Sequence, residues 1–138
     1  MKPIRDILKI DAKHEAAIVQ EFMAAQIKGT PKRDGIIVGV SGGIDSAVVA
    51  ALAVGAVGKD KVYGMILPER DSSPDSAKFA QLVIDSLCIR HETVDLTGPV
   101  ESFGSYTVRD EVIKSIFPEY DESYKFNISL PQNLLDVD

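Results

Sequence analysis

The sequence has few of the cysteine and histidine residues that disulfide frameworks and zinc sites require. Its 138 residues include one cysteine, Cys88, two histidines, His14 and His91, and no tryptophan. A single cysteine excludes an intramolecular disulfide, and these few side chains exclude a cysteine zinc site or a histidine metal cluster. Any metal site is therefore predicted to use oxygen ligands. Cys88 ends an apolar segment, and we expect it to be a small buried side chain.

Long apolar segments are also missing. No stretch approaches the ~20 uninterrupted apolar residues that a membrane helix needs, and the first residues lack the apolar segment of a secretory signal. We therefore expect no membrane partner and predict a cytoplasmic location. The composition, 45% hydrophobic and 26% charged, is that of an ordinary globular core and excludes an intrinsically disordered chain.

Positive charge is too scarce for nonspecific binding to nucleic acid. The sequence has 15 lysines and arginines against 21 acidic residues and a net charge of −6, so we expect no nucleic-acid partner. Most of the acidic excess lies in the last twenty residues, at Glu119, Asp121, Glu122, Asp136 and Asp138. We therefore predict a domain at residues 1–118 and an acidic peripheral extension at residues 119–138.

The apolar residues alternate between helical spacing and short unbroken runs. Helical spacing predicts helices at 11–28, 47–57, 74–88 and 107–116, the last capped by Thr107. Apolar runs predict strands at 36–40, 62–67 and 91–96, and the first of them is typical of a strand covered on both faces. This alternation predicts an α/β fold in which a parallel sheet is layered between helices. Three strands are few for such a fold, so we expect a truncated chain.

A loop of small residues joins the first predicted strand to the next helix, with the sequence Ser41-Gly42-Gly43-Ile44-Asp45-Ser46. The two glycines lack a Cβ atom, so the backbone can approach a ligand closely, and the following helix start offers unpaired N–H groups to an anion. The two serines add hydroxyl donors. At the carboxyl end of a parallel strand, such a loop predicts a polyphosphate site.

Asp45 needs a separate explanation, because a carboxylate repels phosphate unless a cation lies between them. Mg²⁺ commonly bridges one or two carboxylates to substrate phosphates, so Asp45 is a candidate metal ligand. The alternative is ordinary helix-start chemistry, in which Asp45 complements the helix dipole by ~0.3–1 kcal/mol. The loop has neither the lysine of a Walker A motif nor the G-x-G-x-x-G pattern of dinucleotide folds.

The six loop residues match in full the S-G-G-x-D-S pyrophosphate loop, so the sequence resembles the N-type ATP pyrophosphatases. These enzymes cleave ATP between the α and β phosphates while adenylating a substrate. The wider segment 35–68 is most similar to NAD synthetase, and the resemblance covers residues 5–105. It implies a Rossmann-like fold of the adenine nucleotide alpha hydrolase type.

The resemblance also implies a site and an activity. Asp45 would bind Mg²⁺, the backbone near Leu67 would contact adenine, and the ATP phosphates would be bound by Gly39, Val40, Ser41, Gly42, Gly43, Ile44, Asp45 and Ser46. The carboxylate of nicotinic acid adenine dinucleotide would attack the α-phosphate of ATP, and ammonia would then displace AMP to give NAD. This chemistry requires no protein nucleophile, so no catalytic residue is assigned. The resemblance further implies a homodimer.

Several features of NAD synthetases have no counterpart in the sequence. These are the arginine-rich segment after the third strand, the later Gly-Thr loop with its glutamate metal ligand, and the lysine-bearing dinucleotide contacts. We therefore expect part of an ATP site without the complete machinery. Two alternatives stay open: another N-type ATP pyrophosphatase, such as GMP synthetase or a tRNA-modifying adenylase, and a non-catalytic ATP-binding module.

Overall fold

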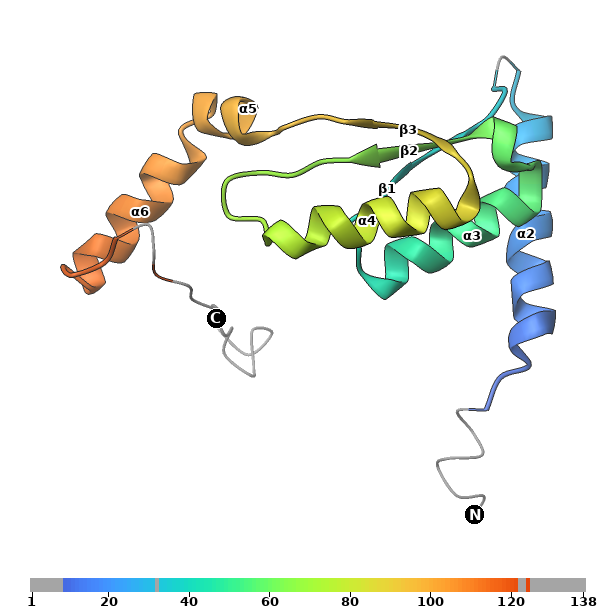
Figure 1. Cartoon of the computed structure of the whole chain (residues 1–138), viewed down its shortest axis with the longest axis horizontal. Helices are drawn as coiled ribbons and strands as arrows, with labels where there is room; N and C mark the ends of the chain where they lie inside the picture. Colours follow the sequence, from blue (N-terminus) through green and yellow to red (C-terminus); the bar gives the residue numbers. More distant parts are fainter. Residues whose placement is uncertain (1–8, 32, 122–123, 125–138) are drawn as a thin grey trace, which may run out of the picture. The chain divides into compact units, whose positions relative to one another are not determined.

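The computed structural model describes residues 9–31, 33–121 and 124, and the chain divides into two compact units, Met1–Thr97 and Gly98–Asp138 (Figure 1). The first unit contains α2 (Ala12–Gly29), β1 (Ile36–Gly39), α3 (Ile44–Val57), η1 (Lys59–Lys61), β2 (Val62–Ile66), α4 (Pro74–Leu87) and β3 (Arg90–Thr93). The later helices are α5 (Thr97–Ser102) and α6 (Ser105–Ile116). The alternation of strands and helices confirms the predicted α/β fold.

The three strands form a parallel sheet in the order β1-β2-β3. In this register Ile36 lies opposite Val62. The pairing continues past the end of β1, where the Val40 N–H donates to the Met65 carbonyl at 2.8 Å. Because the strands are parallel, their carboxyl ends lie at one edge of the sheet, which is where open α/β sheets bind ligands.

One face of the sheet carries the core, and helices α3 and α4 cover it (Figure 1). The helices approach closely because the residues at the contact are small, and Ala50, Ala53 and Ala80 are 0% exposed. A Cβ atom on Gly64 would lie 3.0 Å from the Ile84 Cδ1 atom, so glycine lets α4 pack directly on β2. The buried strand residues of this core are Val38, Val40, Val62 and Ile66.

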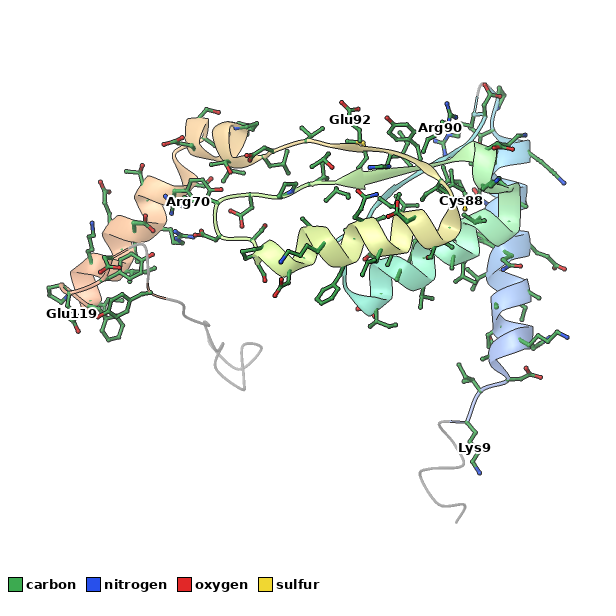
Figure 2. The ribbon with its side chains drawn as sticks, viewed as in Figure 1. Lys9, Arg70, Cys88, Arg90, Glu92 and Glu119 are labelled. Carbon is green, nitrogen blue, oxygen red and sulfur yellow. The ribbon has the colours of Figure 1, made fainter. Side chains whose placement is uncertain are left out.

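The other face of the sheet is uncovered within the described residues. Ile37 on β1 is 73% exposed, and Tyr63 and Met65 on β2 are partly exposed. On β3, Glu92 is exposed and points away from α4 (Figure 2). The expectation that the first strand is covered on both faces is therefore wrong for the described structure, because helices pack on only one side of it.

The second unit is built around α6 and a pair of buried tyrosines, Tyr106 and Tyr120, each 6% exposed. The Tyr120 hydroxyl donates to Asp110 Oδ1 at 3.2 Å. The Arg109 guanidinium also donates to Asp110 Oδ1, at 2.7 Å from Nη2, and lies 5.5 Å from the centre of the Tyr106 ring. Apart from 119–121 and Tyr124, the predicted acidic extension lies outside the described residues.

The structure corrects three local predictions. The helix that begins at Ser105 has Gly104, with φ 72°, as its N-cap, so Thr107 is not the cap. The third strand is predicted at 91–96, yet β3 ends at Thr93 and α5 begins at Thr97, with Pro99 in its first turn, where proline has no N–H to leave unpaired. Cys88 is exposed, because it ends α4 in the left-handed conformation with φ 51°.

None of the helices in the described part of the chain combines the length and the apolar character that a membrane crossing requires.

Candidate functional site

The predicted phosphate loop lies at the carboxyl end of β1 and runs directly into α3. Val40 is buried at 2% exposure, which anchors the start of the loop in the core. The loop then turns at Gly42, which has a φ of +82° that favours glycine. Helix α3 begins at Ile44 with Gly43 as its N-cap, and no side chain makes a capping hydrogen bond. The strand, loop and helix thus follow one another as the sequence predicts.

Two serine hydroxyls close the loop in a ring of hydrogen bonds. The Gly43 N–H donates to Ser41 Oγ at 3.3 Å, and Ser46 Oγ donates to the Gly43 carbonyl at 3.0 Å. The two hydroxyl oxygens lie 3.1 Å apart. Since each hydroxyl has one proton and that of Ser46 goes to Gly43, Ser41 is the donor to Ser46. In this arrangement both hydroxyl protons remain inside the loop and hold its shape.

The donors that remain for a ligand are backbone N–H groups. Ile44, Asp45 and Ser46 are the first residues of α3, where N–H groups have no partner within the helix. The first N–H of the helix ladder is that of Ala47, which donates to the Gly43 carbonyl at 3.2 Å. Unpaired N–H groups at a helix start, together with the positive end of the helix dipole, favour an anion.

Asp45 is exposed in the first turn of α3. Within residues 9–31, 33–121 and 124, no hydrogen bond or ion pair engages its carboxylate. The same residues contain no group of three or more His, Cys, Asp or Glu side chains able to hold a metal ion. Asp45 therefore offers one free carboxylate, and a cation bound there would need further oxygen ligands from a substrate or from water.

Gly42 packs the loop directly against α4. A Cβ atom at this position would collide with the Ser76 carbonyl oxygen. It would also lie 3.0 Å from the Ala80 nitrogen and 3.0 Å from the Phe79 Cβ atom. Because the nearest obstacle is backbone, a larger residue could fit only if the loop or the helix moved. The loop and the first turns of α4 are thus fixed to each other.

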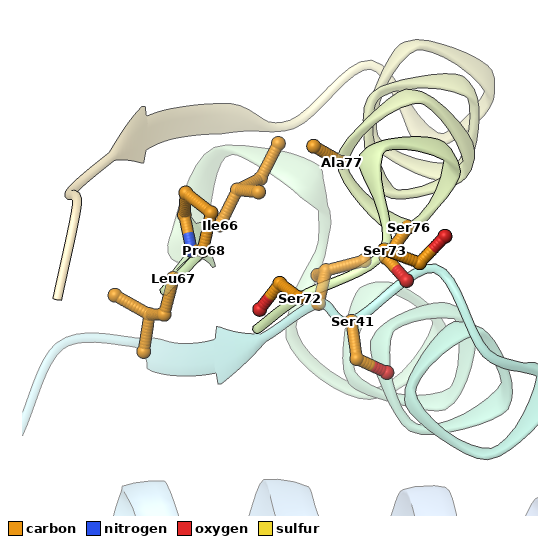
Figure 3. A pocket seen from close by; sticks show the side chains of 9 residues that line it. Ser41, Ile66, Leu67, Pro68, Ser72, Ser73, Ser76 and Ala77 are labelled. Carbon is orange, nitrogen blue, oxygen red and sulfur yellow. The ribbon is translucent and has the colours of Figure 1, made fainter. Parts of the chain in front are cut away.

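A cavity of about 150 Å³ opens beside the loop (Figure 3). In Figure 3, the carboxyl end of β2 and the residues after it, Ile66, Leu67 and Pro68, lie on one side of the cavity, and serines lie on the other side. These serines are Ser41 of the loop and Ser72, Ser73 and Ser76 at the start of α4. Ligand pockets commonly measure ~300–1,000 Å³, so the cavity has room for part of a nucleotide.

The segment between β2 and α4 has its own hydrogen bonds. The Asp71 N–H donates to Glu69 Oε2 at 3.1 Å, and the Glu69 N–H donates to Ser72 Oγ at 3.1 Å. Ser73 is the N-cap of α4 and accepts from the Asp75 N–H at 3.4 Å, followed by Pro74 at the first helical position. This confirms the helix start predicted at residue 74, where a serine cap and a proline at the first position favour a helix.

The structure brings most of the predicted site residues together. Val40, Ser41 and Leu67 line the cavity, and the rest of the loop continues from Ser41 into α3. Gly39 is the exception, because it lies on the uncovered face of the sheet, where a Cβ atom would have no neighbour within 4 Å. Sequence reasoning missed Ser72 and Ser76 as cavity residues, although a serine-rich helix start after a strand end is a usable signal.

A family model described as NAD synthase matches residues 15–120. The chain is 41% identical to the NH(3)-dependent NAD(+) synthetase of Mesorhizobium japonicum over 119 residues, covering 86% of this chain and 37% of the relative. For the enzyme of the same name from Rhizobium meliloti, the identity is 36% over 129 residues, with coverage of 94% and 38%.

Two solved structures share this fold. NMN synthetase from Francisella tularensis superposes with a TM-score of 0.65 at 30% identity, covering 77% of this chain and 44% of that one. The NH3-dependent NAD synthetase of Campylobacter jejuni has a TM-score of 0.63 at 21% identity and coverage of 80% and 52%, which supports the fold alone. The chain spans less than half the length of the curated relatives it matches. By the extent of the family match, the chain belongs to the NAD synthase family.

Proposed function

We propose that the chain provides the ATP-binding part of an amide-forming ligase that makes NAD from nicotinic acid adenine dinucleotide and ammonia. ATP is converted to AMP and pyrophosphate in this reaction. The observation that carries the proposal is the loop at Ser41–Ser46, with its unpaired N–H groups, next to a cavity that ends at Leu67. Relatives named NH(3)-dependent NAD(+) synthetase support the choice of substrates.

The ATP phosphates bind at the loop and the adenine end lies toward the cavity. N–H groups of Ile44, Asp45 and Ser46 donate to phosphate oxygens, while Gly42 and Gly43 let the phosphates approach the backbone. Val40 completes the predicted contacts at the strand end, Gly39 makes none because it lies on the uncovered face, and the backbone near Leu67 contacts adenine. The hydroxyls of Ser41 and Ser46 hold the loop in shape, as the hydrogen-bond ring indicates.

Mg²⁺ fits the donor set of this loop. Asp45 has a carboxylate that is exposed and engaged by no other described side chain, and Mg²⁺ needs only one or two carboxylates when phosphates and water supply the rest. When bound, the ion would neutralise negative charge on the phosphates.

Catalysis by these residues consists of positioning and charge stabilisation. The substrate carboxylate attacks the α-phosphorus, pyrophosphate leaves, and ammonia then displaces AMP to form the amide. Charge develops on the leaving pyrophosphate, and fixed N–H groups at the start of α3 stabilise it without having to reorganise. Alignment of the two substrates lowers the barrier further. No protein nucleophile takes part.

The assembly and location implied by the family resemblance are part of the proposal. The active enzyme is a homodimer in the cytoplasm. Light scattering during gel filtration measures the oligomeric state, and a stable monomer at micromolar concentration would contradict the dimer.

Calorimetric titration with ATP, with and without Mg²⁺, tests the site. We expect binding to the unmodified chain to depend on Mg²⁺, and Asp45→Asn to weaken the Mg²⁺-dependent binding about 10-fold or more. Glu15→Gln is the matched control, because Glu15 is an acid in the first turn of α2 and lies outside the loop and the cavity. Binding that needs no cation and survives Asp45→Asn would instead support a non-catalytic ATP-binding module.

A further inference from the structure

The turn at residues 69–72 joins the two walls of the cavity. It follows Pro68 at the end of β2 and leads into the serine-rich start of α4, and both of these line the cavity. The wall at β2 is fixed by the segment after β3, because the Pro68 carbonyl accepts from the Leu96 N–H at 2.8 Å. The conformation of the turn therefore decides how the first serine of the opposite wall faces β2.

Glu69 and Ser72 hold this turn through reciprocal hydrogen bonds. The Glu69 N–H donates to Ser72 Oγ at 3.1 Å, and the Ser72 N–H donates to the Glu69 carbonyl at 3.0 Å. The Glu69 side chain accepts two more, from the Asp71 N–H to Oε2 at 3.1 Å and from Ser72 Oγ to Oε1 at 3.4 Å. The Glu69 carboxylate thus ties the backbone of the turn to the hydroxyl of Ser72.

The same carboxylate sets the direction of the Ser72 hydroxyl. An ionised carboxylate only accepts hydrogen bonds, so the single hydroxyl proton of Ser72 points to Glu69. One of the two lone pairs of Ser72 Oγ accepts from the Glu69 N–H. No other hydrogen bond reaches this oxygen from the described residues, so its second lone pair is available. Ser72 lines the cavity and therefore offers a ligand an acceptor there (Figure 3).

We propose that Glu69 is a positioning residue that sets the base specificity of the cavity. By taking the Ser72 proton, it makes Ser72 an acceptor for the exocyclic amine of adenine. A base with a carbonyl oxygen in place of the amine is rejected, because two acceptors would then face each other without a proton between them. Glu69 does not itself line the cavity and acts through Ser72. This inference rests on the proposed function, in which the adenine end of ATP lies toward the cavity.

Calorimetric titration with two nucleotides tests this role. ATP with Mg²⁺ carries the amine, whereas ITP with Mg²⁺ has a carbonyl oxygen in its place. In Glu69→Gln the side-chain oxygen accepts from the Asp71 N–H, because a backbone donor cannot be reversed, and the amide NH2 group faces Ser72. The Ser72 proton then turns into the cavity. We expect the preference for ATP over ITP to fall about 10-fold or more, since ATP loses a partner and ITP gains one.

A double-mutant cycle with Ser72→Ala separates this role from a structural one. Ser72→Ala alone is expected to lower the preference about 3- to 10-fold, because it removes the acceptor without adding a donor. In that background Glu69→Gln is expected to change the preference by less than about 2-fold, since no hydroxyl is left to turn. A residue that only stabilised the turn would weaken both nucleotides equally in both backgrounds. Glu92→Gln, the matched control on the exposed strand β3, is expected to leave both affinities unchanged.

The remaining outcomes are distinguishable. Neither Glu69 nor Ser72 belongs to the core, so circular dichroism is expected to show a native fold for each variant. Ser72→Ala is expected to weaken 2′-deoxy-ATP as much as ATP, and an effect confined to ATP would place the donor on the ribose and overturn the proposal. ATP binding with an unchanged preference in Glu69→Gln or in Ser72→Ala would overturn the role of Glu69 alone. Failure of the unmodified chain to bind ATP would overturn the proposed ATP site as well.

Discussion

Replacing Gly42 with alanine tests whether the phosphate loop and α4 are held in one arrangement. The substitution adds a single Cβ atom, and the structure assigns it two separate costs. Gly42 has a φ of +82°, and this left-handed conformation costs an L-residue ~1–2 kcal/mol. The new atom would also collide with the Ser76 carbonyl oxygen and crowd the Ala80 nitrogen at 3.0 Å.

The collision adds to the backbone strain. Forcing an extra carbon into a well-packed contact commonly costs ~1–3 kcal/mol. Alanine also lowers the conformational entropy of the unfolded chain, which raises the free energy of unfolding by ~0.4–1 kcal/mol and offsets part of these costs. We therefore expect Gly42→Ala to lower the free energy of unfolding by about 2–4 kcal/mol. For a domain of this size, each kcal/mol lowers the Tm by roughly 4–8 °C.

Two further alanine substitutions separate the causes. Gly43 has a φ of −82° and its nearest obstacle is Ser41 Oγ at 3.4 Å, so Gly43→Ala is expected to change stability by less than ~1 kcal/mol. Gly58 has a φ of +86° and no neighbour within 4 Å of a Cβ atom, so Gly58→Ala reports backbone strain alone. Urea unfolding of the three variants, followed by circular dichroism, measures the differences.

The reasoning makes two demands on the result. Gly42→Ala must be more destabilising than Gly43→Ala, because only the first includes backbone strain at positive φ and a collision. It must also weaken ATP binding in calorimetry, since the loop can accept the new atom only by moving away from α4. A Gly42→Ala protein as stable as Gly43→Ala would refute the close packing of loop and helix.

Two other positions give sharp expectations. Cys88→Gly is expected to raise the free energy of unfolding by about 0.5–1 kcal/mol. Glycine removes the backbone strain of the left-handed conformation at φ 51°, although its greater freedom in the unfolded chain cancels part of that gain. A lower free energy of unfolding in urea would contradict this expectation. Hydrogen bonds from the Thr97 hydroxyl and the Thr97 N–H hold the pKa of Asp95 below its ordinary value of 3.8, so their contribution to stability is complete above about pH 4 and is lost as the pH falls through the lower folded pKa. Asp95→Asn should therefore destabilise the protein near pH 7 and much less near pH 3, and equal effects at both would argue against the contact.

The fold and the position of the glycine loop between β1 and α3 could be predicted because their signals are local. The apolar run at 36–40, the two glycines and the helix start of α3 follow one another along the chain, so one strand–loop–helix unit contains the whole pattern. The exact helix boundaries were harder to predict, since α3 begins at Ile44 and not at residue 47. Helix α5 begins at Thr97, soon after a strand that is shorter than predicted, and Gly104 replaces Thr107 as the cap of α6.

The remaining parts of the site depend on contacts between distant segments. Ser76 comes beside Gly42 only because α4 packs on the sheet through Ala80 and Ile84, and no spacing in the sequence reports this approach. The directions of the hydrogen bonds made by the Ser41 and Ser46 hydroxyls can be assigned only from atomic positions. The sequence alone assigns both serines to phosphate binding. Cys88 shows the same limit, since burial was inferred from apolar neighbours while the helix end turns the residue outward.

The position of the glycine loop at the margin of the sheet has a consequence for how a substrate is enclosed. Among the described residues, β1 has a strand neighbour on one side only, and the loop follows its carboxyl end. A molecule held there meets the start of α4 and the serines of the cavity on the β2 side, whereas the described residues place no strand at its opposite flank. Within the described part of the chain, a bound phosphoanhydride is therefore shielded from water from the β2 side alone.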